Sequence, residues 1–168
     1  MLSILVNQCH ASCMDVLQQQ FNRCREESIR DTQQQSIVAE QLFRDIQTTH
    51  QETSQIPDDL LIALQFVFGQ CALPALDLVD QHSVTCLSSP SGRQAFQVIG
   101  GSGRLYTCFA SCHYCPCPAF AYTVLRRNEG LLCKHILAVY LCQAVGGTRQ
   151  ESVSDQQMSA LLSGTAAP

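Results

Sequence analysis

The sequence predicts an α+β fold with three parts. These are a helical N-terminal half, a small antiparallel three-stranded meander, and a module that ends in a buried helix. Cysteine and histidine side chains hold this module together. Before residue 82 the apolar residues recur every three to four positions, and after it they recur every second position, which favours helices first and strands second. Between residues 115 and 135, three cysteines and one histidine have the spacing of metal ligands.

The bulk composition fits one small protein with a surface that needs a partner. The 168 residues suffice for one domain, or for a compact core with an arm. Because 46% of the residues are apolar and only 14% are charged, we expect some apolar surface to face another chain. No uninterrupted apolar run reaches the roughly 20 residues of a membrane span, and the first residues lack the basic region of a secretory signal. We therefore expect no membrane contact and an intracellular location, where the eleven cysteines remain thiols or metal ligands.

The charge is divided unevenly along the chain. Residues 1–82 hold four arginines against eleven acidic residues, whereas residues 83–168 hold six basic residues against three acidic ones. Lys134 is the only lysine. Sequence-independent binding of nucleic-acid phosphates would therefore depend on a few arginines.

The N-terminal half divides at about residue 35. Residues 1–35 have too few apolar positions for a core face, and we predict a poorly ordered or loosely docked arm. Residues 36–82 are predicted to be a helical region. Its first helix carries Val38, Leu42 and Ile46 along one side.

The second helix of this region is unusually rich in large apolar residues. It begins near Pro57, which a first helical turn tolerates, and Gly69 ends it. A shorter helix follows and runs to Asp80. The apolar side chains of residues 60–68 cover more than one stripe, so we expect this helix to be buried on most sides, by its own fold or by another chain. These helices are a candidate partner-binding surface, with an ordinary core as the equal alternative.

The region 83–150 is predicted to hold the meander and the Cys/His module. Alternating apolar and polar residues predict three strands. Turn-forming serines, glycines and a proline join them. The predicted strands are 83–88, 94–99 and 104–109.

Helices are predicted again in the C-terminal part of the chain. Residues 119–127 can form a short helical segment, and residues 133–144 are apolar nearly all round, which predicts an interior helix that Gly146 ends. Residues 151–168 are predicted to be a short C-terminal helix and tail, with Ser154 at the N-terminal cap of the helix.

Cys115, Cys117, Cys133 and His135 are predicted to bind one structural zinc ion. Three thiols and an imidazole are a ligand set that suits tetrahedral Zn²⁺. In an extended or turn segment residues two apart point the same way, so Cys115 and Cys117 can face one ion. In a helix such residues diverge by about 200°, so Cys133 has to lie at or before the first turn of the helix that follows. Four protein ligands leave no position for an activated water, which favours a structural site.

The other cysteines and histidines receive no metal role. Cys108, Cys112 and His113 lie close to the predicted ligands and could replace one, but packing or hydrogen bonding is the favoured interpretation. Cys112 and His113 are only sequence neighbours, which is no argument for thiol catalysis. We therefore expect that the protein is not an enzyme and that it has no small-molecule substrate.

A second possible ligand set lies near the N-terminus. Cys9, His10 and Cys13 have helical spacing, but Cys24 is the only fourth ligand near them. The segment also lacks a core that would hold these side chains in place, so we do not predict metal binding there.

The four predicted ligands resemble a SWIM domain, whose pattern is C-x-C, a variable gap and C-x-H. Phe120 just inside the first pair and Ala138 one turn after the last ligand resemble that domain too. Over about residues 36–163 the chain resembles the SWIM-domain subunit of the animal Shu complex. The segments that carry this wider resemblance are Ile56-Pro57-Asp58, Ala75-Leu76-Asp77-Leu78-Val79-Asp80, Ser88-Ser89-Pro90-Ser91-Gly92-Arg93, Tyr106-Thr107-Cys108 and Ser111-Cys112-His113-Tyr114-Cys115.

The resemblance implies a nuclear, non-enzymatic protein that pairs with a RecA-like ATPase paralogue. Together they would support the eukaryotic RecA-like recombinase and its paralogues in homologous recombination, including double-strand break repair. The resemblance assigns metal binding to the four predicted ligands. It also assigns a packing role to Ala138, whose small side chain would let the helix approach the metal.

Two alternatives stay open beside this adaptor role. A direct DNA-binding zinc module would use Arg126, Arg127 and Lys134, which flank the ligands. A substrate adaptor in another zinc-dependent assembly, such as a ubiquitin ligase of the RING type, would need two interleaved metal sites, whereas the sequence offers one good set. The adaptor in a recombination complex is the favoured hypothesis.

Overall fold

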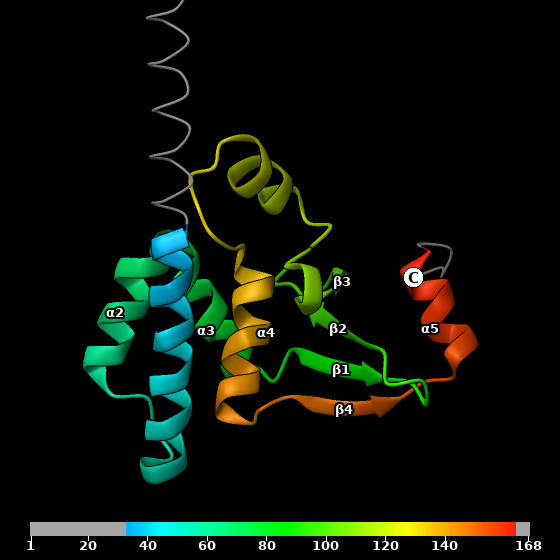
Figure 1. Ribbon diagram of the computed structural model, residues 1–168, viewed down its shortest axis with the longest axis horizontal. Helices are drawn as coiled ribbons and strands as arrows, with labels where there is room; N and C mark the ends of the chain where they lie inside the picture. The colour runs from blue at the N-terminus through cyan, green and yellow to red at the C-terminus, as the bar shows by residue number, and fades with distance from the viewer. Residues whose placement is uncertain (1–32, 164–168) are drawn as a thin grey trace, which may run out of the picture. The chain divides into compact units, whose positions relative to one another are not determined.

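The computed structural model describes residues 33–163, and Figure 1 shows how they are arranged. The chain divides by its contacts after Ile37, and the packing described below is that of the unit that begins at Val38. Most of the predicted arm, residues 1–35, and the possible ligand set at Cys9, His10 and Cys13 lie outside the described residues.

The helices predicted for the N-terminal half are present. One helix spans residues 33–53, α2 spans Asp58–Phe68 and α3 spans Ala72–Asp80. Between the last two lies a 3₁₀ turn, η1, at Gly69–Cys71. Gly69 ends α2 with a φ of 56°, a left-handed conformation that glycine adopts without strain. The break at Gly69 turns the chain, so that α3 runs back beside α2 (Figure 1).

Burial in these helices differs from the sequence-based expectation at two places. In the first helix Leu42 and Ile46 are buried as expected, but Ala39 is the third core residue, while Val38 is 44% exposed. In α2 only Leu64 and Phe68 are buried, so this fold alone does not enclose the helix on most sides, and burial by another chain stays a prediction. The outer face of α2 is open.

The predicted meander forms the centre of the sheet. Strands β1 (Val84–Ser88), β2 (Gln94–Ile99) and β3 (Leu105–Cys108) are antiparallel neighbours in chain order. Since successive side chains of a strand point to opposite faces, Cys86 of β1 faces the main core, whereas the next residue, Leu87, faces a second, smaller core.

A fourth strand corrects the predicted sheet. β4 (Arg149–Ser152) pairs in parallel with β1, so the described sheet has the order β3-β2-β1-β4 and is mixed rather than purely antiparallel. All four residues of β4 are exposed, and the strand carries no apolar alternation that could have predicted it. The α+β class is confirmed.

Helix α4 (Lys134–Val145) lies at the centre of the main core. Its buried residues face all directions: His135, Ile136, Leu137, Ala138, Val139, Leu141 and Cys142. Figure 1 shows α4 between the sheet and the N-terminal helices, and α3 is in extensive contact with it. The prediction of an interior helix is confirmed, and Gly146 ends it with a φ of 71°.

The two remaining helical segments differ in type. The segment predicted at 119–127 contains a π-helix, η3 (Phe120–Arg126), instead of an ordinary α-helix. Helix α5 (Asp155–Leu162) begins with a capping box in which Ser154 and Gln157 satisfy each other's backbone N–H groups. Met158 of α5 is buried against Leu87 and Ala95, which makes the smaller core on the second face of the sheet.

Candidate metal centre

Two stretches of backbone bring the predicted ligands together. Cys115 and Cys117 lie between the 3₁₀ turn η2 (Ala110–Cys112) and the π-helix η3. Cys133 is the N-cap of α4 and has an extended backbone, with φ −88° and ψ 164°. It therefore lies before the first turn of the helix, where its side chain can converge with that of His135.

The geometry of the Cys/His cluster (Cys115, Cys117, Cys133 and His135) suits one tetrahedral cation. Its four ligand atoms lie within 4.8 Å of one another, and all four residues are buried. The Cys115 Sγ atom is 3.7 Å from the His135 Nδ1 atom. Bond lengths of about 2.3 Å to sulfur and about 2.0 Å to nitrogen place such a pair of ligand atoms about 3.5 Å apart around zinc. The spacing therefore matches a zinc site in which Nδ1 is the imidazole ligand.

The pKa values of the three cluster thiols indicate that a bound cation would stabilise them. Hydrogen bonds from Cys115 and Cys133 hold the pKa of Cys117 far below its usual value. The pKa of Cys115 is raised, first by its hydrogen bond with Cys108, and that of Cys133 is raised, first by its hydrogen bond with Cys115. One thiolate is thus stabilised at the expense of its neighbours. A divalent cation would supply the charge that lets all three thiols ionise.

Backbone amides are already placed to support thiolates. The Phe120 N–H donates to the Cys117 Sγ atom over 3.3 Å, at the start of η3. The Ile136 N–H donates to the Cys133 sulfur, as an amide in the first turn of a helix does for an N-cap acceptor, and this bond opposes part of the rise in the Cys133 pKa that the hydrogen bond with Cys115 causes. Each of the two ligand pairs, Cys115 with Cys117 and Cys133 with His135, therefore contains a sulfur that a peptide N–H group stabilises.

Two residues that sequence reasoning left without a role shape the pocket of His135. The His135 Nε2 atom is buried and has no hydrogen-bond partner among the described residues. The Tyr106 ring lies against the imidazole, with the ring centres 4.3 Å apart. A Cβ atom on Gly100 would come within 3.3 Å of Nε2 and 3.1 Å of the Tyr106 ring, so this glycine permits a close approach. In the sequence, Gly100 is only the first residue of a turn-forming run of glycine and serine.

The neighbouring thiols and His113 have the secondary positions expected for them. Cys108 is fully buried and hydrogen-bonds with Cys115, but it is not part of the cluster. Cys112 is exposed. His113 instead meets Tyr140, whose hydroxyl group lies 2.5 Å from the His113 Nδ1 atom. The structure thus keeps all three outside the group of convergent ligand atoms.

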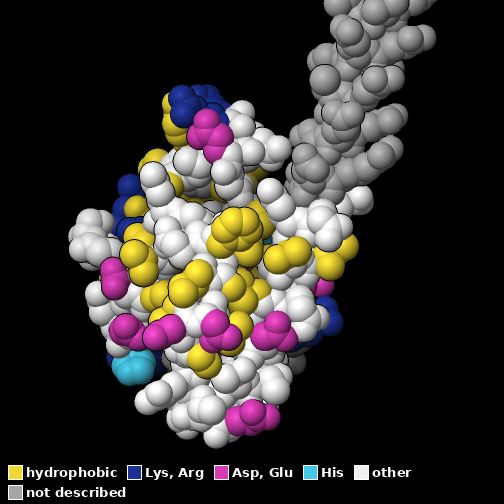
Figure 2. Space-filling model, turned by 90° about the vertical axis from the view of Figure 1, so that its left-hand side faces the viewer, with side chains coloured by type: hydrophobic (Ala, Val, Ile, Leu, Met, Phe, Trp, Pro, Cys, Tyr) yellow, Lys and Arg dark blue, Asp and Glu magenta, His cyan; other side chains and the backbone are white. Residues whose placement is uncertain are grey.

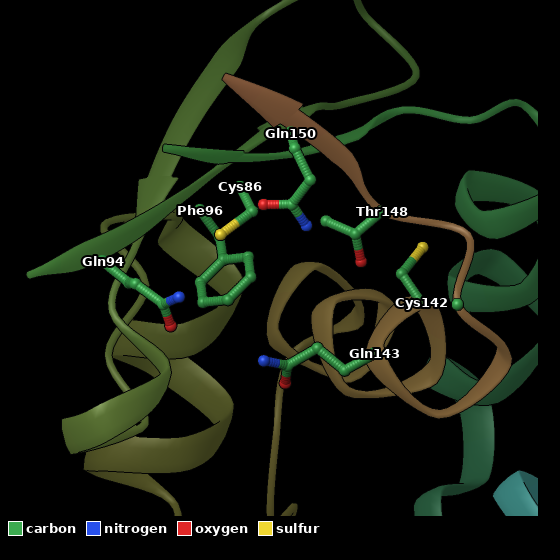
Figure 3. Close-up of a pocket in the computed structure, with 8 residues that line it drawn as sticks. Cys86, Gln94, Phe96, Cys142, Gln143, Thr148 and Gln150 are labelled. Atoms are coloured by element: carbon green, nitrogen blue, oxygen red, sulfur yellow. The ribbon is translucent and has the colours of Figure 1, made fainter. Parts of the chain in front are cut away.

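A separate cavity lies at the opposite end of α4. It has a volume of about 320 Å³ and opens between the C-terminal end of that helix and strands β1, β2 and β4 (Figure 3). Its lining combines amides, thiols and one aromatic ring: Cys86, Gln94, Phe96, Cys142, Gln143, Gly146, Thr148 and Gln150. Because neither a histidine nor a carboxylate lines it, this cavity lacks the base that would activate its thiols.

Comparison with known proteins identifies the class of the Cys/His module. The SWIM zinc finger family matches residues 106–144, a stretch that contains all four residues of the cluster. The chain therefore carries a SWIM zinc finger. No solved structure is significantly similar to the chain.

Relatives of similar length define the family more closely. Zinc finger SWIM domain-containing protein 7 of Danio rerio is 76% identical over 126 residues, which cover 75% of this chain and 90% of the relative. The protein of the same name from Homo sapiens is 53% identical, over 74% of this chain and 89% of the relative. A homologue from Dictyostelium discoideum is 28% identical over 63% of this chain and 69% of its own length. The chain belongs to the family of zinc finger SWIM domain-containing protein 7.

Proposed function

We propose that the chain is a non-enzymatic, zinc-binding subunit of a Shu-type complex in the nucleus. In this proposal it pairs with a RecA-like ATPase paralogue, and the pair supports the eukaryotic RecA-like recombinase and its paralogues during homologous recombination. One zinc ion, held by Cys115, Cys117, Cys133 and His135, has a structural role.

The observation that carries the proposal is the closed and buried Cys/His cluster within a SWIM zinc finger. Four convergent protein atoms fill the coordination shell of a tetrahedral ion, so no position is left for a water or a substrate. Zinc bound in this way would fix the loop around Cys115 to the N-terminal end of α4. Its contribution is then to stability, and the surface of the module remains for a partner.

The basic residues near the cluster give less support to direct DNA binding. Arg127 forms an ion pair with Glu129, with 3.3 Å between nitrogen and oxygen. The same guanidinium group lies 4.7 Å from the centre of the Tyr122 ring. To bind a phosphate, the Arg127 guanidinium group would have to leave or share these two contacts, and we favour the adaptor over the DNA-binding module.

Co-expression with the RecA-like ATPase paralogue of the same organism tests the proposal. We expect a stable heterodimer in size-exclusion chromatography with light scattering, and about one zinc per chain in elemental analysis. The Cys117→Ser variant should lose both the zinc and the heterodimer. The Cys112→Ser variant is the matched control, because this thiol is exposed and outside the cluster, and it should retain both.

DNA binding by the isolated chain separates the alternatives. The adaptor should show no appreciable affinity for DNA alone. Should the chain alone bind DNA with a steep salt dependence, and should Arg126→Ala with Arg127→Ala abolish that binding, the DNA-binding module would replace the adaptor. A wild-type chain that carries zinc but forms no heterodimer would refute the Shu-type role and leave the zinc assignment standing.

A further inference from the structure

Helices α2 and α3 expose large apolar side chains to solvent. Phe66 is 90% exposed, Ile62 is 69% exposed and Leu73 is 64% exposed. Ile62 and Phe66 are four residues apart and therefore lie on the same side of α2. Figure 2 looks onto this side of the molecule and shows hydrophobic side chains gathered there. We call Ile62, Phe66 and Leu73 the apolar face.

Acidic residues border the apolar face on one side. The segment 58–80 contains four aspartates and neither lysine nor arginine. Asp58 and Asp59 open α2, whereas Asp77 and Asp80 close α3. Because α3 runs back beside α2, both pairs lie at the same end of the two helices, and Figure 2 shows a row of acidic side chains beneath the hydrophobic ones.

Two of these aspartates are placed against the preference of their own helix. The C-terminal end of a helix carries partial negative charge and favours lysine or arginine. Asp77 and Asp80 occupy the last turn of α3, where no basic residue accompanies them. No ion pair within 4.0 Å that involves either residue occurs among the described residues. Their charge is therefore available to an external cation.

A bilayer is a poor occupant for this face. By length and composition alone, Asp58–Asp80 would pass as a membrane span. The segment is broken at Gly69, however, and its inner side is buried: Leu64, Phe68, Ala72, Ala75 and Leu78 belong to the main core. Acidic residues along its border would also be repelled by an anionic membrane surface.

We propose that the apolar face is the docking site for a protein partner that offers a hydrophobic pocket for Phe66 with lysine or arginine side chains beside it. This inference rests on the proposed function, because it takes the partner to be the RecA-like ATPase paralogue of the heterodimer. Phe66 is the anchor, since a large, rigid aromatic side chain buried at the centre of an interface carries a large part of the affinity. The aspartates orient the partner and speed association.

The first experiment measures heterodimer affinity by isothermal titration calorimetry for two variants. Phe66→Glu should weaken binding about 30-fold or more, while zinc content and Tm stay those of the parent, because the side chain is exposed in the free chain. Leu125→Glu is the matched control, since Leu125 on η3 is 65% exposed but remote in the sequence from the face. It should bind like the parent.

The second experiment uses the unusual position of Asp77 and Asp80. Lysines at these positions suit the C-terminal end of α3, so Asp77→Lys with Asp80→Lys should keep or raise Tm. The same change should weaken binding of the partner about tenfold at low ionic strength and less at high ionic strength. Opposite effects on stability and on binding cannot come from partial unfolding.

The outcomes separate this inference from the proposed function. Parent-like affinity of Phe66→Glu for the ATPase paralogue would overturn the docking site and leave the Shu-type role intact. Failure of the wild-type chain to bind the paralogue would overturn both. A wild-type dimer of this chain that Phe66→Glu converts to a monomer, or binding to phosphatidylcholine vesicles that Phe66→Glu abolishes, would assign the face to another occupant and also overturn the inference.

Discussion

The Cys/His cluster and helix α5 both join segments that are distant in the sequence, but their chemistry differs. The cluster joins residues 115–117 to the start of α4 through buried soft ligands. Helix α5 is attached to the β1–β2 hairpin by a small core around Met158 and by exposed polar contacts of Arg93 with Asp155 and Ser159. Removing one ligand from the cluster should therefore have a far larger effect than removing one contact at α5.

The largest expected effect is the loss of a cluster ligand. The binding free energy of structural zinc sites is about 10 to 16 kcal/mol in small zinc peptides, which rivals the stability of a whole domain. Cys117→Ser should therefore release the zinc and unfold the SWIM module, as elemental analysis and thermal unfolding with and without a chelator would show. If Cys117→Ser melts like its parent and still carries zinc, the cluster does not stabilise the protein more than the contacts of α5 do.

The second effect concerns the smaller core at α5. Met158 is fully buried, and Met158→Ala should cost about 2 to 5 kcal/mol through lost burial and a cavity. Hydrogen exchange should quicken in α5, whereas the zinc content should stay unchanged. Leu162→Ala is the control, because Leu162 is about half exposed and outside this core. Zinc loss in Met158→Ala would mean that the two regions are coupled rather than independent.

The third effect lies around the imidazole of the cluster. Gly100→Ala would press a methyl group against the ring of Tyr106 and against His135 Nε2, at an expected cost of about 1 to 3 kcal/mol. Competition with a chromophoric chelator should show weaker zinc binding. Gly101→Ala is the matched control in the same turn, since its Cβ would meet nothing within 4 Å. Equal zinc affinity of the two variants would remove Gly100 from the site.

These effects also show why part of the site could be predicted from sequence and part could not. The ligand set was visible because its pattern is local: two cysteines two residues apart, and a cysteine and a histidine that begin a helix. The close approach of Gly100 and Tyr106 to His135 depends on how the β2–β3 turn packs on α4, and no local spacing encodes such a contact. Sequence could identify a turn there, but not its neighbour.

The fold follows the same division. Helices α2 and α3 and the three antiparallel strands have apolar periodicity, and α4 is apolar nearly all round, so these elements could be predicted. Strand β4 consists of exposed residues and exists because the chain returns beside β1 after α4. The π-helix η3 differs from an α-helix by its wider hydrogen-bond pattern, which residue spacing does not reveal. Local residue patterns therefore do not predict β4 or the π-helical form of η3.

The smallest effect is a difference in pH dependence between the two regions. Hydrogen bonds from the Ser91 side chain, and further ones from Ser89, the Ser91 amide and Arg93, lower the pKa of Asp155 from its usual 3.8 to about 2. A lowered pKa favours the folded state above the usual value, and this stabilisation is lost as the pH falls from about 4 towards 2. The cluster should respond at higher pH, because protons compete with zinc for its thiolates and imidazole.

Amide NMR spectra recorded from pH 7 down to pH 2 would separate these two transitions. Between pH 7 and pH 4 we expect zinc release to change the signals of residues around the cluster, while those at the start of α5 stay in place because Asp155 remains charged. Below pH 4 the α5 signals should move in the parent but not in Asp155→Asn, which has no carboxyl group to protonate. If the α5 signals move together with those of the cluster above pH 4, zinc release also loosens the attachment of α5. The two regions would then not be independent.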